Sequence, residues 1–168
     1  YQFYTGQAGT SQRISTGNLD FPYATKIQRT AGQTGTGAVQ LGQVIETNNC
    51  QDLAGQTCTL SVYLTAGSNF SGAGSQIYVG VVTGSGVDQG ANAGFSLGTW
   101  TSWANSLNTL QTITTTRTKY TFNVSIPAGT QEIGLRFYFV PTGTAGADDS
   151  VTITGVQLEK GSAATSFD

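Results

Sequence analysis

Eight segments of this chain have the residue pattern of β-strands, and clusters of Gly, Asn and Ser separate many of them. The segments are residues 23–30, 38–47, 58–65, 76–82, 110–115, 119–126, 132–140 and 151–159. No helical period is visible between them. Many short strands at close spacing are typical of stacked antiparallel sheets. The pattern therefore predicts an all-β chain, folded as an antiparallel two-sheet β-sandwich of jelly-roll type.

Within these segments the side chains alternate, as they do on the two faces of a strand. Leu60, Val62 and Leu64 lie on one face of their segment, and Ser61 and Tyr63 lie on the other. The same reasoning assigns to the core Ile77, Val79, Val81, Ile133, Leu135, Phe137, Phe139, Val151 and Ile153. Burial of each large apolar side chain stabilises a fold by about 1.5–3 kcal/mol, so we expect these faces to fix the register of the sheets.

The length of 168 residues fits one core, and charged residues are few. Seven Lys and Arg stand against nine Asp and Glu, which gives a net charge of -2. Nucleic acid is a poor partner for such a chain, because phosphate binding needs clustered cations. No apolar run reaches the length of about 20 residues that spans a bilayer. We therefore expect neither a nucleic acid nor a membrane partner.

Gly-rich connections and a weakly patterned start frame the predicted strands. The long connections are residues 66–75, 83–108 and 142–149. Loops of this length are often functional. Residues 1–20 are polar, and we expect them to form a connector from an upstream stalk or an edge strand near residues 12–16. The sandwich domain is predicted to span residues 21–168.

Five segments, taken in order, resemble a known family. They are residues 23–32 (YATKIQRTAG), 53–67 (LAGQTCTLSVYLTAG), 98–100 (GTW), 141–149 (PTGTAGADD) and 151–167 (VTITGVQLEKGSAATSF). They are similar to segments of the carbohydrate-binding-like β-sandwich domains found at the C-terminus of bacteriophage tail and other virion proteins. The resemblance covers residues 12–167, and it supports the sandwich that the pattern predicts.

The resemblance implies a non-catalytic adhesion domain of a tail fibre or related virion appendage. Its partners would be a host surface glycan and other virion proteins, its display would be homotrimeric, and its location would be the extracellular virion particle. One alternative is a decoration, cement or fibre-tip assembly protein with no glycan ligand. Another is a carbohydrate-binding module attached to a secreted bacterial enzyme.

Two tryptophans, Trp100 and Trp103, lie in the longest Gly-rich connection. Flat aromatic faces stack on the C–H faces of sugar rings, and neighbouring amides hydrogen-bond sugar hydroxyls. Both indoles are therefore candidate ligand contacts. The alternative is that they cap an open end of the sandwich.

A second candidate surface consists of Tyr63, Tyr78, Arg136 and Tyr138, which fall on strand positions opposite the core. Together they would form an aromatic and guanidinium groove for an oligosaccharide. A solvated sheet face and a contact with a neighbouring subunit are the other interpretations.

Adjacent acids and a pair of cysteines complete the set of candidates. Asp148 and Asp149 are oxygen ligands of the kind that Ca²⁺ prefers, although acids in Gly-rich loops also form turns. Calcium is the only cofactor that we consider. Cys58 stands where the family pattern has Val, and Cys50 precedes it across a turn, so the two are a candidate disulfide.

Catalysis is disfavoured by the residue inventory. The chain has no His, so a Ser or Cys nucleophile would lack its usual base. No G-x-S-x-G motif and no phosphate-binding loop occur. We therefore expect a binding or structural protein and not an enzyme.

Overall fold

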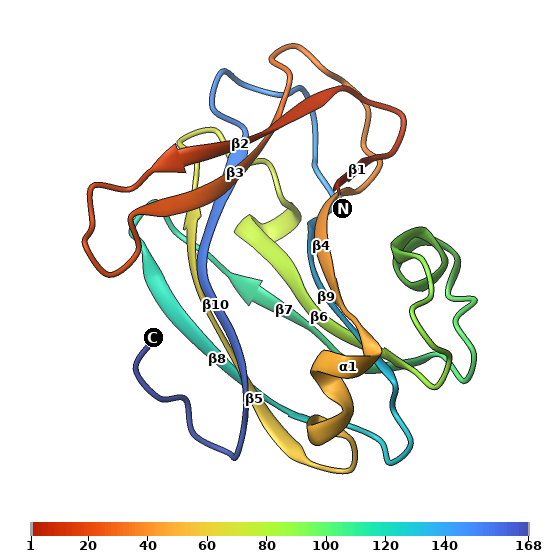
Figure 1. Cartoon of the computed structure of the whole chain (residues 1–168). Coiled ribbons are helices and arrows are strands. Elements are labelled where there is room, and N and C mark those ends of the chain that lie inside the picture. Colours follow the sequence, from red (N-terminus) through yellow and green to blue (C-terminus); the bar gives the residue numbers. More distant parts are fainter. Residues whose placement is uncertain (1, 168) are drawn as a thin grey trace.

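The computed structural model describes residues 2–167, and within this range it shows side chains from residue 5 onward. Ten strands form two five-stranded antiparallel sheets that pack face to face (Figure 1). The predicted fold class, an all-β sandwich of jelly-roll type, is confirmed. No helix in the described range is long and apolar enough to cross a membrane.

Along the chain, successive strands mostly alternate between the two sheets. Sheet A has the order β1 (Gln2–Tyr4), β4 (Val39–Ile45), β9 (Glu132–Phe139), β6 (Gln76–Gly84) and β7 (Ala104–Thr112). Sheet B has the order β2 (Gly9–Ser15), β3 (Tyr23–Arg29), β10 (Ser150–Lys160), β5 (Thr57–Ala66) and β8 (Thr118–Ser125). Among the described strands, only β2–β3 and β6–β7 are hairpins within one sheet. All other connections between consecutive strands cross between the sheets, so most neighbours in a sheet are distant in sequence.

The start of the chain contributes an edge strand to each sheet. β1 pairs with β4 over residues 39–41, and β2 pairs with β3 along its whole length. β1 therefore leaves the second half of β4 unpaired on that side. An upstream stalk stays a prediction.

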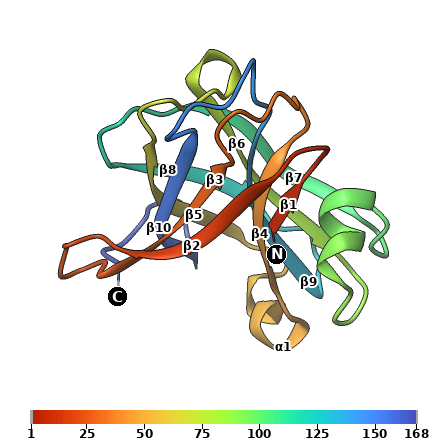
Figure 2. The same cartoon turned by 90° about the horizontal axis from the view of Figure 1, so that it is seen from above.

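Two sequence predictions need correction. The connection predicted for residues 83–108 is shorter, because β7 already begins at Ala104. Short helical turns, absent from the prediction, occur at α1 (Thr47–Cys50), η1 (Gln51–Leu53), η2 (Ala73–Ser75) and a π-helical turn, η3 (Ala93–Leu97). Figure 2 shows η3 lying on the side of the molecule away from β8 and β10.

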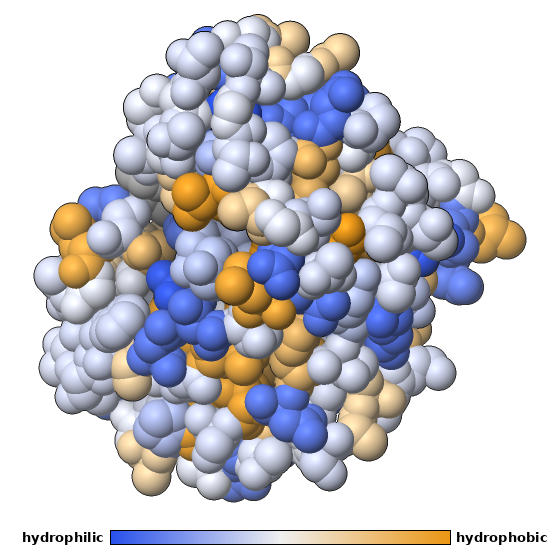
Figure 3. Space-filling model, turned by 180° about the vertical axis from the view of Figure 1, so that it is seen from behind, coloured by the Kyte–Doolittle hydropathy of each residue, from blue (hydrophilic) through white to orange (hydrophobic). Residues whose placement is uncertain are grey.

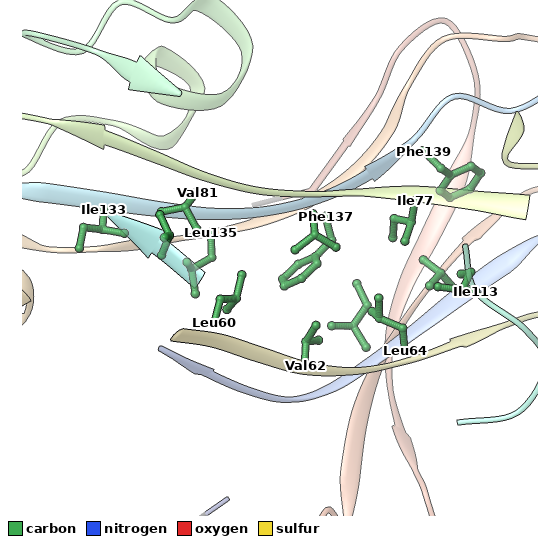
Figure 4. Packing of buried hydrophobic residues seen from close by; sticks show 14 of the residues in the cluster. Leu60, Val62, Leu64, Ile77, Val81, Ile113, Ile133, Leu135, Phe137 and Phe139 are labelled. Carbon is green, nitrogen blue, oxygen red and sulfur yellow. The ribbon is translucent and has the colours of Figure 1, made fainter. Parts of the chain in front are cut away.

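The core lies between the sheets, as the alternation predicted. Leu60, Val62 and Leu64 of β5 are fully buried, and Leu135 and Phe137 of β9 face them (Figure 4). Close packing of such side chains in fixed rotamers determines which face of each strand points inward.

The predicted disulfide is not formed. Cys50 and Cys58 are both free and fully buried in the core. The physical reason is local: residues 47–53 form helical turns instead of a simple reversal, and the Cys50 Sγ donates to the Thr47 carbonyl oxygen at 3.7 Å. Burial raises the pKa of both thiols, so they remain protonated at neutral pH.

A buried ion pair fixes the loops at one end of the sandwich. Arg29 Nη1 lies 2.7 Å from Asp149 Oδ2, and both side chains are inaccessible to solvent. Asp149 also accepts hydrogen bonds from the backbone and hydroxyl of Ser71. Arg29 donates further to the carbonyl oxygens of Gln33 and Gly35. These bonds join segments up to 120 residues apart.

Candidate functional site

The outer face of sheet A carries a stacked pair of tyrosines. Tyr78 of β6 and Tyr138 of β9 are register partners, and their rings are nearly parallel, with centroids 4.4 Å apart. Gln40 of β4 is the register partner of Tyr138 on its other side, and Leu110 of β7 is that of Tyr78. We call this surface the tyrosine face. It consists of Gln40, Tyr78, Asn105, Asn108, Leu110, Arg136 and Tyr138.

An irregularity in β7 gives this face two amides. The register of β7 against β6 shifts between Asn105 and Leu107, so Asn105 and Asn108 both pair with outward-facing positions of β6. Asn105 Oδ1 accepts a hydrogen bond from Arg136 Nη2, and Asn108 Oδ1 accepts one from the Tyr138 hydroxyl, each at 3.3 Å. The amides thus orient the two polar side chains at the centre of the face.

Arg136 lies in the space left by a glycine. A Cβ atom at Gly80 would stand 2.9 Å from both Cγ and Nε of Arg136, so only glycine permits this close approach. The guanidinium carbon lies 5.2 Å from the centroid of the Tyr138 ring. Arg136 is only 9 % exposed, and burial lowers the pKa of its guanidinium group. The side chain is therefore packed against the sheet and does not extend freely into solvent.

Two buried nitrogen atoms of the tyrosine face have no hydrogen-bond partner among the described residues. These are Arg136 Nε and Gln40 Nε2. Buried donors are nearly always paired in folded proteins, and leaving one unpaired costs about 1–3 kcal/mol. The unpaired donors therefore point to a ligand that accepts hydrogen bonds at this face.

The long connection before β7 borders the tyrosine face, and its tryptophans hold that connection together. Trp100 is buried, and its Nε1 donates to the Gly90 carbonyl oxygen at 3.0 Å. Trp103 is half-buried, and its Nε1 donates to the Gly94 carbonyl oxygen at 2.9 Å. Both indoles pack with Val82 in a small apolar cluster outside the main core. Val82 lies on the outer face of sheet A, so the indoles cover part of that face instead of an open end of the sandwich, and Trp100 has no open face for a sugar.

Phe95, in the same connection, packs over two glycines that neighbour Arg136 in sheet A. Cβ atoms placed at Gly42 and Gly134 would meet its ring at 2.8 and 2.6 Å. In sheet A, Gly42 is the register partner of Arg136, and Gly134 precedes it by two residues on the same face. The aromatic connection therefore forms a wall at one end of the tyrosine face.

Tyr63 does not belong to this surface. It lies on β5 in sheet B, so it faces the opposite side of the sandwich from Tyr78 and Tyr138. Its ring packs 4.6 Å from that of Phe21, which in turn contacts Phe167 at 5.0 Å. The prediction that four residues form one groove is therefore wrong for Tyr63. The structure brings together Tyr78, Arg136 and Tyr138 and leaves Tyr63 beneath the C-terminal tail.

The two candidate calcium ligands serve as structural acceptors. Asp148 pairs with Lys26 at 2.7 Å and accepts hydrogen bonds from Ser68 and Ser150. Burial opposes ionisation of Asp148, but these bonds and the charge of Lys26 lower its pKa to about 2. Asp149 is occupied by Arg29. Within residues 5–167 no group of three or more acids, cysteines or histidines could hold a metal ion, and calcium binding by Asp148 and Asp149 stays a prediction.

A concavity of about 510 Å³ runs along β4 where β1 no longer pairs with it. Its walls combine apolar residues of both sheets, such as Phe137 and Ile153, with the acids Glu46, Asp88 and Glu132. Glu132 is fully buried, and its pKa is raised by burial. Seen from behind, hydrophobic residues reach the surface near the middle of the molecule and are interrupted by hydrophilic ones (Figure 3).

Several residues of the tyrosine face escaped sequence reasoning. Gln40 lies in a segment that is predicted to be a strand, but no local pattern indicates that it neighbours Tyr138. The sequence pattern predicts a loop for Asn105 and Asn108. One signal was present: Gly80 and Gly134 interrupt apolar strands, and glycine inside a strand often marks a close approach of another group.

Comparison with known structures shows which fold class this is. No protein-family model matches the chain, and no curated protein matches its sequence. The solved structures that it resembles include several carbohydrate-binding modules. The chain has the carbohydrate-binding-module type of β-sandwich.

Three of these structures illustrate the likeness. A CBM4 module has a TM-score of 0.58 at 16 % identity, with 94 % of this chain and 81 % of that chain covered. A family 16 carbohydrate-binding module has a TM-score of 0.53 at 10 % identity, with 93 % and 88 % covered. The enzymatically active domain of tailspike protein 4 from bacteriophage CBA120 has a TM-score of 0.56 at 13 % identity. There, 95 % of this chain matches only 18 % of that chain. At such identities the likeness establishes the fold alone.

Proposed function

We propose that this protein binds carbohydrate at the tyrosine face without altering it chemically. The observation that carries the proposal is the stacked Tyr78–Tyr138 pair beside two buried, unpaired donors, Arg136 Nε and Gln40 Nε2. Sugars offer apolar C–H faces together with many hydrogen-bond acceptors, so they match both parts of this surface. The fold that the chain shares with carbohydrate-binding modules supports the proposal.

The biological setting that we propose is a bacteriophage virion. The chain would be a tail-fibre or appendage domain, displayed on the extracellular particle, that recognises glycans of the host surface. The sequence resemblance supports this setting, and a tailspike that contains a similar fold is consistent with it. A single shallow site would bind weakly, and a homotrimer would compensate through avidity. Sedimentation equilibrium tests the trimer, and antibody labelling of intact particles tests the location.

A glycan array probed with the purified chain tests the binding function. We expect retention of at least one saccharide class, and Tyr138→Ala should weaken that binding by about tenfold or more, as truncation of a central aromatic contact does. Tyr63→Ala is the matched control, because it removes a half-buried tyrosine from the opposite face. Equal losses from both variants, or retention of no saccharide, would exclude the tyrosine face as a carbohydrate site. Mass spectrometry of the recovered saccharide should show no chemical change.

A structural role in assembly is the second candidate. Leu110, next to Tyr78 on the same face, is 46 % exposed, and exposed apolar side chains are common at protein contacts. In that case Leu110→Glu would disrupt the association of the chain with its partner. If saccharide binding alone responds to changes at this face, the assembly role is excluded.

A further inference from the structure

Arg136 is a nearly buried cation without an anionic partner. The ion pairs among residues 5–167 join Lys26 to Asp148, Arg29 to Asp149 and Lys160 to Asp52. Arg136, at 9 % exposure, takes part in none of them. Charged groups that leave water are normally paired or fully hydrogen-bonded, because desolvation of an ion is costly.

The hydrogen bonds of Arg136 are also far from complete. A guanidinium group has five N–H donors. In Arg136 the Nε is buried without a partner, and Nη1 makes no hydrogen bond with any described residue. Nη2 makes one long bond, 3.3 Å, to Asn105. The aromatic ring of Tyr138 and this amide orient the guanidinium group but leave its charge unneutralised.

The surroundings keep the guanidinium group in place for a ligand. Gly80 provides the space beneath it, and Tyr138 lies along one side. Because the side chain is already immobilised by the sheet, little rotamer entropy remains to be lost on binding. A partly desolvated charge also attracts an opposite charge more strongly than one in open solvent.

We propose that the saccharide bound at the tyrosine face is acidic, and that Arg136 binds its carboxylate. This inference rests on the proposed function and specifies its ligand class, sugars of the uronic or sialic acid type. A planar carboxylate suits a guanidinium group better than a hydroxyl does, because it carries the opposite charge and can accept two parallel N–H bonds. The buried Nε2 of Gln40, across from Tyr138, is a second unpaired donor among the described residues, and it reaches the sugar only if the Gln40 side chain moves on binding. A neutral sugar would cover the cation without neutralising it.

Matched pairs of saccharides test the inference by calorimetry. The pairs are sialyllactose with lactose, and tetragalacturonate with its methyl ester, with a sulfated oligosaccharide as a further arm. We expect the acidic member of at least one pair to bind at least about tenfold more tightly at low salt, and this preference should shrink as salt is added. Tighter binding of the sulfated oligosaccharide than of both carboxylates would assign the site to sulfate and overturn the carboxylate assignment.

Two charge-matched variants separate a local effect from general electrostatics. Arg136→Gln should abolish the preference for the acidic member and leave binding of the neutral member within about twofold. Arg13→Gln removes the same charge from exposed β2 in sheet B, and it should keep the preference. Thermal melts establish that both variants are folded.

The possible failures are distinguishable. If neutral and acidic members bind wild-type protein equally, or if Arg136→Gln retains the preference, the acidic ligand class is wrong while carbohydrate binding stands. If the wild-type protein binds no saccharide in the pairs or on the array, the proposed function fails and this inference fails with it.

Discussion

Arg29 and Arg136 are both almost inaccessible to solvent, but their surroundings are opposite. Arg29 uses Nε, Nη1 and Nη2 in hydrogen bonds and pairs with a buried carboxylate, Asp149, at 2.7 Å. Arg136 has one long hydrogen bond and no carboxylate partner among the described residues. The first arrangement is complete within the chain. The second is complete only with a group from outside.

This difference separates structural residues from ligand-binding ones. The segments that carry the family resemblance contain Arg29, in IQRTAG, and Asp149, in AGADD, and the structure joins them in the buried pair. The tail signature contributes Gly155, which has a left-handed φ of 56° where the register of β10 against β5 shifts. These motifs therefore encode the fold. The residues that we assign to binding lie mostly outside them, which is consistent with a fold that serves different ligands.

The largest effect is expected from breaking the complete pair. Arg29→Gln should lower the free energy of unfolding by about 3–5 kcal/mol, because Asp149 would remain buried without its counter-charge. Urea denaturation measures the loss. Arg136→Gln is the comparison, and it should change stability by less than about 1 kcal/mol, since no buried carboxylate loses a partner. Equal losses in the two variants would show that Arg136 is as structural as Arg29.

Displacement of Arg136 without a change of charge should weaken binding about tenfold. Gly80→Ala places a methyl group 2.9 Å from Arg136 Cγ and Nε, so the side chain must shift away from its position beside Tyr138. Calorimetry with the acidic saccharide measures the effect. Gly90→Ala is the control, because a Cβ at Gly90 meets no atom within 4 Å. Unchanged affinity in Gly80→Ala would mean that the orientation of Arg136 does not matter.

Glu132, on the same face of β9 as Arg136, is a buried acid without a basic partner among the described residues. Its Oε2 accepts the Gln89 N–H at 2.8 Å, whereas Oε1 has no partner among the described residues. Burial raises its pKa, and the nearby Asp88 and Glu46 raise it further against the hydrogen bond from Gln89. A raised pKa means that Glu132 favours the fold at a pH below its unfolded value of about 4.3, and that this contribution disappears as the pH rises through its folded pKa.

Glu132→Gln should therefore stabilise the protein at neutral pH by about 1 kcal/mol, since the amide keeps the acceptor without the charge. Urea denaturation at several pH values should show the advantage of the variant growing from about pH 4 towards pH 7. A variant that is less stable than wild type at pH 7 would contradict the view that the buried charge of Glu132 destabilises the fold.

The smallest effect is expected from calcium. Asp148 and Asp149 already accept bonds from Lys26, Arg29 and three serines, so added calcium or EDTA should move the melting temperature by less than about 1 °C. A rise of several degrees with calcium would show that these carboxylates exchange their internal partners for the ion.

Much of the fold could be predicted, because burial imposes the period of two on every core strand. The alternation placed Leu60, Val62, Leu135 and Phe137 in the core, where the structure has them. It could not show which strands share a sheet, since most connections cross between the layers. Tyr63 was therefore grouped with Tyr138, although the two lie on opposite sides of the sandwich.

The site was predictable only in part, for a related reason. Tyr78, Arg136 and Tyr138 share a face that the alternation identified. The basic partners of Asp148 and Asp149, however, lie more than 110 residues away in sequence, so these ion pairs have no local signature. The shift in β7 that exposes Asn105 and Asn108 is likewise set by pairing with β6. Local pattern shows which residues point outward, and tertiary pairing determines which of them meet.

The most direct test compares the Nε–H resonances of the two arginines by NMR while an acidic saccharide that binds in calorimetry is added. The account predicts that the Arg136 signal shifts and exchanges more slowly with solvent as the carboxylate pairs with it, whereas the Arg29 signal stays constant. Changes confined to sheet B or to the concavity along β4, with Arg136 unmoved, would contradict it.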